Sequence, residues 1–152
     1  MDLKTKLGAG VVSAAIALVA AWEGRSLIAY VDPVGIPTIC DGYTQEVKLG
    51  DMASPQRCDA LTEQEVRRAL SVVDRSVSYP LPDEVRVALS SFVYNVGAGA
   101  YANSTLLRKL RARDIAGACQ ELDRWVYAGG RKLRGLERRR QAERQLCLSS
   151  LH

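Results

Sequence analysis

Histidine is almost absent from this 152-residue sequence, which contains only the terminal His152. A catalytic triad built on an internal imidazole is therefore excluded. No GxSxG, Walker A or GxGxxG motif joins a predicted strand to a helix, so the corresponding hydrolase and nucleotide sites are not expected either. The four cysteines form no CxxC pair, so we expect no structural zinc site and no metal. Any catalysis has to rest on carboxylates.

Repeats and low-complexity segments are also absent. Only 5 prolines and 12 glycines occur, and 47% of the residues are hydrophobic, which excludes a disordered or collagen-like chain. The length allows one globular domain and no second full domain. A net charge of +4 indicates a polyanionic partner, which could be a nucleic acid, an acidic membrane or an anionic cell wall.

An uncharged run of sixteen residues, 7–22, lies close to the N-terminus behind Lys4 and Lys6. It is shorter than the roughly 20 apolar residues of a membrane span, and its alanines and glycines make it only weakly hydrophobic. A basic start, an apolar middle and small residues at Val19 and Ala21 are typical of an export signal. The alternative is a helix buried in the core of the domain.

The remaining pattern predicts an α+β protein that is mostly helical, with one small β hairpin near the N-terminus and a helical C-terminal part. The β element is expected within residues 27–45, where β-branched and aromatic residues alternate with prolines and glycines. A capping box of Thr62 and Glu65 predicts the start of a helix at Thr62. The helices are expected at 3–23, 62–79, 83–96, 104–111, 114–125 and 136–148.

The cysteines allow three pairings if both disulfides form, or four buried thiols in a reducing compartment. We favour Cys40–Cys58, which closes the loop beyond the hairpin, and Cys119–Cys147, which joins two C-terminal helices. Disulfides would agree with export from the cytoplasm.

Two carboxylates and a hydroxyl form the pattern E-x8-D-x5-T near the front of the chain. Glu23 ends the apolar helix, where a half-desolvated carboxylic acid can keep a proton to donate. Asp32 lies on the turn DPVG, where solvent and backbone favour the ionised form. Thr38 can orient a water molecule between them. A proton donor, a charged carboxylate and a water-orienting hydroxyl are what an inverting glycosidase needs, although each residue is also common in an ordinary turn or strand.

The stretch that carries this pattern, WEGRSLIAYVDPVGIPTICDGYT, resembles the opening of the phage-type lysozymes, glycoside hydrolase family 24. Further matches are SFVYNVGAGAYANSTLLRKL, GACQELDRWVYAGG and GLERRRQAE, so the resemblance covers nearly the whole chain. It implies that Glu23 is the general acid, Asp32 the second carboxylate and Thr38 the catalytic threonine, with no cofactor. One departure is Tyr43, where many members of the family carry histidine.

The resemblance implies a lysozyme-like fold and an endolysin, a muramidase that cuts the β-1,4 links between N-acetylmuramic acid and N-acetylglucosamine. The uncharged run further resembles that of signal-arrest-release endolysins. We therefore expect residues 1–22 to remain uncleaved as a tether in the host inner membrane and residues 23–152 to form the catalytic domain, released into the periplasm. The partners are then peptidoglycan and membrane, without nucleic acid, and the enzyme is expected to be a monomer.

Supporting residues are expected around the three central ones. Tyr30, Asn95, Ser104 and Thr105 could line a saccharide groove. Either Arg138 or Arg139 is expected to turn inward and pair with acidic groups near Glu23. The alternatives to the muramidase are a non-catalytic protein that binds membranes or nucleic acid through its basic C-terminal helix, and a glycosidase that acts on chitin.

Overall fold

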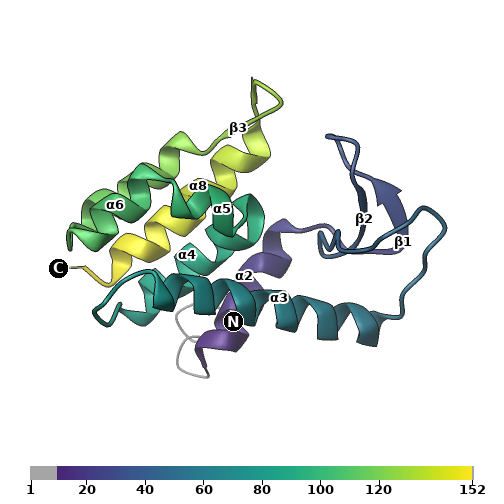
Figure 1. Cartoon of the computed structure of the whole chain (residues 1–152), viewed down its shortest axis with the longest axis horizontal. Coiled ribbons are helices and arrows are strands. Elements are labelled where there is room, and N and C mark those ends of the chain that lie inside the picture. Colours follow the sequence, from purple (N-terminus) through teal and green to yellow (C-terminus); the bar gives the residue numbers. More distant parts are fainter. Residues whose placement is uncertain (1–9, 152) are drawn as a thin grey trace.

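A computed structural model describes residues 10–151 (Figure 1). The elements follow in the order α2 (Val11–Trp22), β1 (Ser26–Val31), β2 (Pro37–Cys40), α3 (Pro55–Arg75), α4 (Asp83–Val96), α5 (Ala98–Ala102), α6 (Thr105–Arg111), α7 (Ile115–Glu121), η1 (Leu122–Arg124), β3 (Tyr127–Ala128), β4 (Arg131–Lys132) and α8 (Arg134–Ser149). The predicted α+β, mostly helical, lysozyme-like fold is confirmed.

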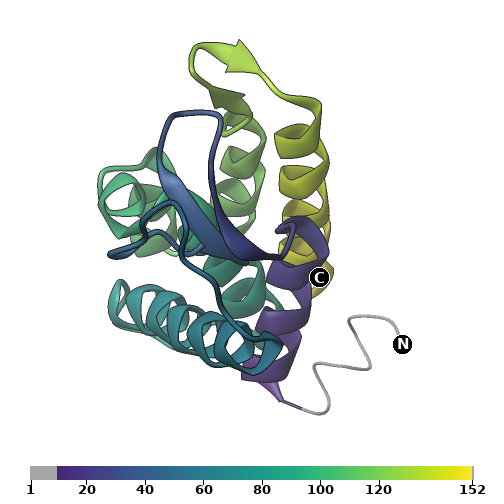
Figure 2. The same ribbon diagram turned by 90° about the vertical axis from the view of Figure 1, so that its right-hand side faces the viewer.

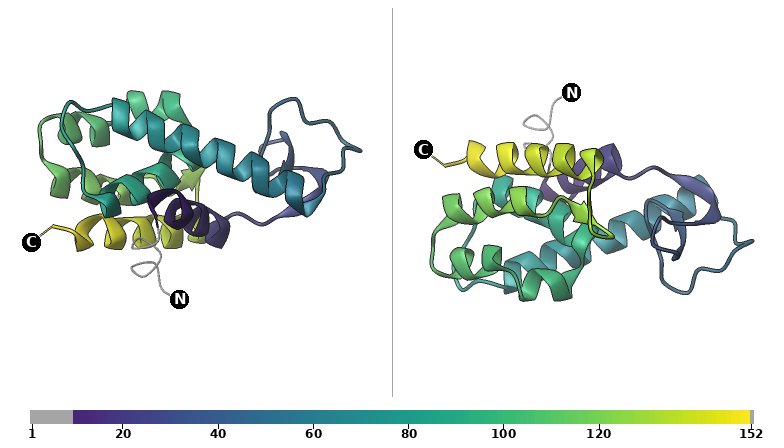
Figure 3. Two further views of the ribbon diagram at one scale, coloured as in Figure 1. Left: turned by 90° about the horizontal axis from the view of Figure 1, so that it is seen from below. Right: turned by 90° about the horizontal axis from the view of Figure 1, so that it is seen from above.

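The molecule divides into a small β lobe, residues 24–54, and a larger helical body formed by α2 and α4 to α8. The long helix α3 runs from the lobe into the body (Figures 1 and 3). The lobe has its own small core, which contains Ala29, Ile39 and Leu61. Its antiparallel strands pair Tyr30 with Thr38 and Val31 with Pro37.

Helix α4 forms the centre of the helical body and packs against α2, α3 and α8. Its side chains from Val87 to Phe92 are buried, as expected for a helix surrounded by other helices. Although they come from opposite ends of the chain, α2 and α8 lie on the same flank of the body (Figure 2), and Glu23, which directly follows α2, pairs with Arg139 of α8. Their proximity brings the end of α2 close to charged residues of α8.

Both favoured disulfides are present. Cys40–Cys58 joins β2 to α3, and Cys119–Cys147 joins α7 to α8. No free cysteine remains. One disulfide thus closes the β lobe on α3, and the other closes the C-terminal end of the body.

Several predicted boundaries were wrong. Helix α3 begins at Pro55 instead of Thr62, because Ser54 accepts a hydrogen bond from the Arg57 N–H and caps it. Thr62 lies inside the helix and donates a hydrogen bond to Asp41 instead of capping. The helix predicted over 114–125 ends as α7 at Glu121 and continues as the 3-10 turn η1.

The strands β3 and β4 form a second hairpin, in a segment that was expected to be a loop. Gly129 and Gly130 connect them with φ angles of 58° and 77°. A two-residue hairpin turn with positive φ at both central residues favours glycine, which adopts positive φ without strain. Helix α8 consequently begins at Arg134, before the predicted start at residue 136.

Residues 3–9 of the predicted N-terminal helix, and residues 7–9 of the uncharged run, lie outside the described residues. The described part of that helix is α2, which buries Ala14, Ala15, Leu18 and Val19 against the core. Within residues 10–151, no helix is long and apolar enough to cross a membrane.

Candidate active site

Glu23 is the residue at which α2 ends. Its backbone is extended, with φ −90° and ψ 127°, and its N–H donates the last helical hydrogen bond to the Val19 carbonyl. The chain therefore leaves the helix here and enters the β lobe at Ser26. This position aims the carboxylate at the boundary between the helical body and the lobe.

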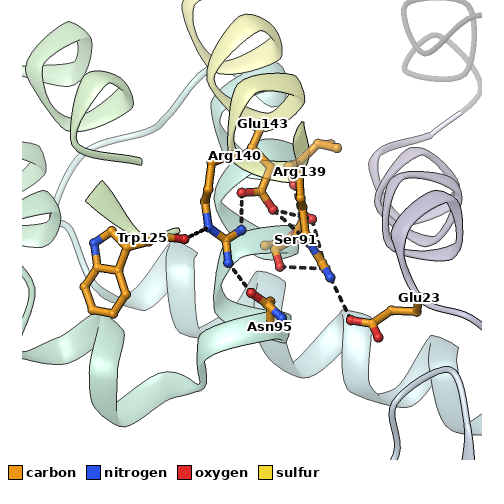
Figure 4. Close-up of polar contacts among 9 residues, drawn as sticks. Glu23, Ser91, Asn95, Trp125, Arg139, Arg140 and Glu143 are labelled. Atoms are coloured by element: carbon orange, nitrogen blue, oxygen red, sulfur yellow. Dashed lines mark hydrogen bonds and ion pairs between the residues drawn. The ribbon is translucent and has the colours of Figure 1, made fainter. Parts of the chain in front are cut away.

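The partner of Glu23 is Arg139, which is 116 residues away in the sequence. Arg139 Nη1 lies 2.7 Å from Glu23 Oε1, and the arginine side chain is only 5% exposed (Figure 4). Arg138, the other arginine considered, is exposed on the same helix. The inward-facing arginine is therefore Arg139.

A buried carboxylate organises Arg139 and its neighbour Arg140 (Figure 4). Glu143 Oε2 lies 3.3 Å from Arg139 Nε and accepts a hydrogen bond from the Ser91 hydroxyl at 2.6 Å. Glu143 Oε1 lies 2.5 Å from Arg140 Nη1. We name Glu143, Arg139, Arg140 and Ser91 the buried ionic cluster. Of these four residues, the sequence predicted only Arg139, as one of two candidates; Glu143 and Ser91 were not identified.

Asp32 is held by its own turn. Its Oδ1 accepts hydrogen bonds from the N–H groups of Val34 at 2.9 Å and Ile36 at 2.8 Å. Gly35 allows this tight turn with a φ of +87°. Oδ2 accepts no hydrogen bond from any of the residues described, so it is available to a water molecule or a substrate.

Thr38 lies on β2, directly opposite Tyr30 on β1. The residue is 3% exposed, and its hydroxyl donates a hydrogen bond to the Ile36 carbonyl at 2.8 Å. Because that bond uses the hydroxyl proton, the lone pairs of Oγ1 remain free to accept a hydrogen bond from water.

Gly42, just after β2, lies close to the Glu23 carboxylate. A Cβ atom at this position would lie 2.9 Å from Glu23 Oε2, and the φ of Gly42 is +87°. A glycine is thus favoured here both by the backbone conformation and by the lack of space. Sequence analysis did not assign a role to Gly42, although the CDG turn was a possible signal.

Asp41 anchors the lobe to the body beside this contact. Arg25 binds its carboxylate through two hydrogen bonds, and Thr62 on α3 donates a third. The Tyr94 hydroxyl on α4 donates to the Asp41 carbonyl at 2.7 Å. Burial raises the pKa of the Asp41 carboxyl, but the bonds from Arg25 and Thr62 outweigh burial and leave it below the usual value.

Two cavities lie near the boundary between the helical body and the lobe. One of about 300 Å³ is lined by Gly42, Tyr43 and Tyr94, among others. A second, of about 480 Å³, is lined by Glu23, Asn95 and residues at the start of α8. Gly42, which lies close to Glu23, thus lines the first cavity, and Glu23 itself lines the second cavity. Both volumes are of the size that small-ligand sites have.

The four residues expected to line a saccharide groove fall into two groups. Tyr30 is 39% exposed on β1, and burial, together with the negative charges of Glu23 and Asp32, raises its pKa. Asn95 lines the second cavity. Ser104 is instead buried as the N-cap of α6, and Thr105 accepts a hydrogen bond from Arg108. The hydrogen bonds of these two residues are therefore with α6 and, for Ser104, also with the Tyr101 carbonyl of α5.

Comparisons with known proteins identify the family of this chain. Residues 20–143 match the family model for phage lysozyme. A SAR-endolysin of Enterobacteria phage PA-2 is 43% identical over 127 residues, which cover 83% of this chain and 77% of that relative.

Two solved structures of one endolysin are also similar to this chain. The active form of the P1 phage endolysin Lyz superposes with a TM-score of 0.79 at 26% identity, over 91% of this chain and 84% of that one. The secreted inactive form of Lyz gives a TM-score of 0.56 at 24% identity, over 71% of this chain and 77% of that one. The chain belongs to the phage lysozyme family, and it is a muramidase, a glycoside hydrolase of host-cell lysis.

Proposed function

We propose that this phage lysozyme hydrolyses the β-1,4 link between N-acetylmuramic acid and N-acetylglucosamine with Glu23 as its general acid. The observation that carries the proposal is the position of Glu23 at the boundary between body and lobe. Arg139 binds Oε1, whereas Oε2 faces Gly42 and the lobe. Oε2 is thus the oxygen from which a proton would pass to the leaving glycosidic oxygen.

Asp32 and Thr38 are proposed to position and activate the attacking water. The free Oδ2 of Asp32 can accept a proton from that water, and Oγ1 of Thr38 can accept a hydrogen bond that orients it. An inverting route requires room for this water, with the two carboxyl groups about 6.5 to 9.5 Å apart, and a retaining route about 5 Å. The anomeric configuration of the first product, observed by NMR, distinguishes the two routes.

The substrate is proposed to be peptidoglycan, with chitin at most a minor one. The test is the loss of turbidity of Gram-negative cells whose outer membrane has been permeabilised. We expect rapid clearing by the purified protein. A protein that only binds membrane or nucleic acid would leave the suspension turbid. We further propose that the enzyme acts as a monomer, because Glu23, Asp32 and Thr38 come from one chain.

We also propose that residues 7–22 tether the inactive enzyme in the host inner membrane, facing the periplasm, and that residues 23–152 form the catalytic domain. The composition of α2 supports two environments. Its buried face packs small side chains on the body, and its exposed positions Ser13, Ala20 and Ala21 are small and uncharged. Such a face tolerates water and adds no charge that would oppose a bilayer.

Release would then assemble the site, because Glu23 directly follows α2. While the run is in the membrane, Glu23 is at the bilayer surface and cannot meet Gly42 or Arg139. The likeness of this structure to the active form of Lyz, with a TM-score of 0.79, supports docked α2 as the active arrangement. No cysteine precedes Cys40, so a thiol within the tether cannot take part in activation.

The tether can be tested by replacing Gly8 and Gly10 with leucine. Greater hydrophobicity should hold the protein in the membrane and delay lysis. N-terminal sequencing of the released wild-type enzyme should begin at Met1 or Asp2. A fully active released form that begins at Trp22 would replace the tether with an ordinary cleaved signal.

A further inference from the structure

The buried ionic cluster contains more charge than a simple structural ion pair needs. Glu143 is fully buried, and so is nearly all of Arg140. Burying charges is costly unless each is paired and hydrogen-bonded, and one arginine would be enough to neutralise Glu143. The second arginine leaves the cluster with an excess positive charge, which only the carboxylate of Glu23 balances.

One remaining donor group of each arginine points toward the candidate active site, and the others bind Ser91 and Trp125. Arg139 Nη1 binds Glu23. Arg140 donates to the side-chain oxygen of Asn95, which lines the second cavity, and to the Trp125 carbonyl at 2.9 Å. Since Glu143 receives a hydrogen bond from each arginine, this one carboxylate fixes the orientation of both (Figure 4).

We propose that Glu143 is a positioning residue for the hydrolysis: it aims Arg139 at Glu23 and Arg140 at Asn95, and it shares the charge of Arg139 with Glu23. The inference rests on the proposed role of Glu23 as the general acid. Glu143 does not touch the reacting atoms and acts only through the arginines. Ser91 supports it by donating a hydrogen bond to Oε2.

The shared charge has a consequence for the pH profile. The charged and titratable groups facing Glu23 are Arg139 and Arg140 from α8, Tyr94 from α4 and Tyr30 from the lobe. With Glu143 ionised, part of the positive charge of the arginines is neutralised. Without that charge, the two arginines act on Glu23 alone and favour its ionised form, which cannot donate a proton.

The test is the pH dependence of kcat/KM of Glu143→Gln on soluble peptidoglycan fragments. The loss of the charge should move the basic limb of the profile to lower pH by about half a unit to one unit. Loss of alignment should reduce kcat by up to about 100-fold, as expected for a misplacement of about 1 Å, with a smaller change in KM.

The chain offers a matched control. Glu121 is another buried glutamate with two cationic partners, Lys109 at 2.7 Å and Arg124 at 3.2 Å, and none of these residues belongs to the site. Glu121→Gln should lower the melting temperature without moving the pH limb. A purely structural role for Glu143 would make its glutamine variant behave in the same way, and that result overturns the proposal.

A second variant covers the case in which Glu143→Gln fails to fold. Glu143→Asp keeps the charge but shortens the side chain, so kcat should fall while the pH limb stays in place. An unchanged kcat in a folded Glu143→Asp protein also overturns the proposal. Failure of the proposed function is recognised separately, because Glu23→Gln would then remain active whatever Glu143 does.

Discussion

The two halves of the proposed active site are held in opposite ways. Asp32 is fixed by hydrogen bonds from residues two and four positions later, on an exposed turn of the β lobe. Glu23 is fixed by Arg139, 116 residues later, which itself depends on the buried Glu143. One carboxylate is thus organised locally, and the other requires the whole helical body to be assembled.

This difference indicates that activity can be controlled by the docking of α2, which carries Glu23 into the proposed site. The lobe carries Asp32 and Thr38 on a hairpin that Cys40–Cys58 closes onto α3. In the proposed tether model, Glu23 enters the site only when α2 has docked and the chain passes Gly42. The acid half is therefore the half that a displaced N-terminal segment would disable.

The largest effect is expected for Glu23→Gln. The amide has the shape of the carboxyl group and can still accept the hydrogen bond from Arg139, but it cannot supply the proton. Activity should fall by roughly 100-fold to 10,000-fold, the range for general acid catalysis. Initial rates of turbidity loss measure the effect, and circular dichroism should show an unchanged fold. Lysis at the wild-type rate would remove Glu23 from its role.

Asp32→Asn should cause the next largest loss, about 100-fold to 1,000-fold. Asparagine keeps an oxygen that can accept from Val34 and Ile36, so the turn should persist while the charge is lost. Asp51→Asn is the matched control, because Asp51 also accepts a backbone hydrogen bond within a turn of the lobe, from Lys48. Equal activities of the two variants would contradict the assignment of Asp32.

Replacing the two disulfides, one pair at a time, should have similar effects on stability but different effects on activity. Replacing either pair with alanine should lower the free energy of unfolding by about 3 kcal/mol, and the longer Cys119–Cys147 loop should lose slightly more. Loss of Cys40–Cys58 should in addition reduce activity, since it loosens the lobe that carries Asp32. Urea unfolding and initial rates on the same samples measure both. Equal activity losses for the two pairs would show that the lobe is not specially dependent on its disulfide.

The smallest effect is expected at Gly42, where the two halves meet. Gly42→Ala should reduce activity by about tenfold, because its Cβ would displace Glu23 Oε2 by a fraction of an ångström. Gly50→Ala is the control: Gly50 also lies in the lobe with a positive φ, +97°, and no atom lies within 4 Å of its added Cβ. Both variants should lose about 1 kcal/mol of stability from backbone strain. Identical activities would mean that the contact between Gly42 and Glu23 is unimportant.

The local half of the site could be predicted from the sequence. The turn around Asp32, the strand with Thr38 and the helix end at Glu23 all follow from residues that are neighbours in the chain. The same is true of the hairpin and most helices. Gly129-Gly130 was a usable hairpin signal as well, but the strands it joins have only two residues each.

The long-range half could be predicted only as far as an arginine of the last helix that pairs near Glu23. Arg138 and Arg139 are consecutive on a helix, so the choice between them depends on how α8 is rotated against the body. Glu143 belongs to a run rich in charge, which is typical of a solvated face, although it is fully buried. Its partner Ser91 is 52 residues away. Only the packing of α4 against α8 brings the two together.

The start of α3 shows a third kind of difficulty. Its first turn, from Pro55, is polar and exposed, so no apolar periodicity marks it. The pattern of Thr62 and Glu65 therefore predicts a helix start seven residues later than the observed one. Thr62 instead donates a hydrogen bond to Asp41, which lies 21 residues earlier in the sequence. No local pattern reveals this partner.

The mass of the soluble products released from purified peptidoglycan tests the central claim most directly. General acid catalysis by Glu23 with an attacking water predicts fragments that end in a reducing N-acetylmuramic acid, each having gained one water molecule at the cut bond. The Glu23→Gln protein should release almost none. Products that end in anhydro-muramic acid, one water lighter, or peptides freed from an uncut glycan would contradict hydrolysis by Glu23, Asp32 and Thr38.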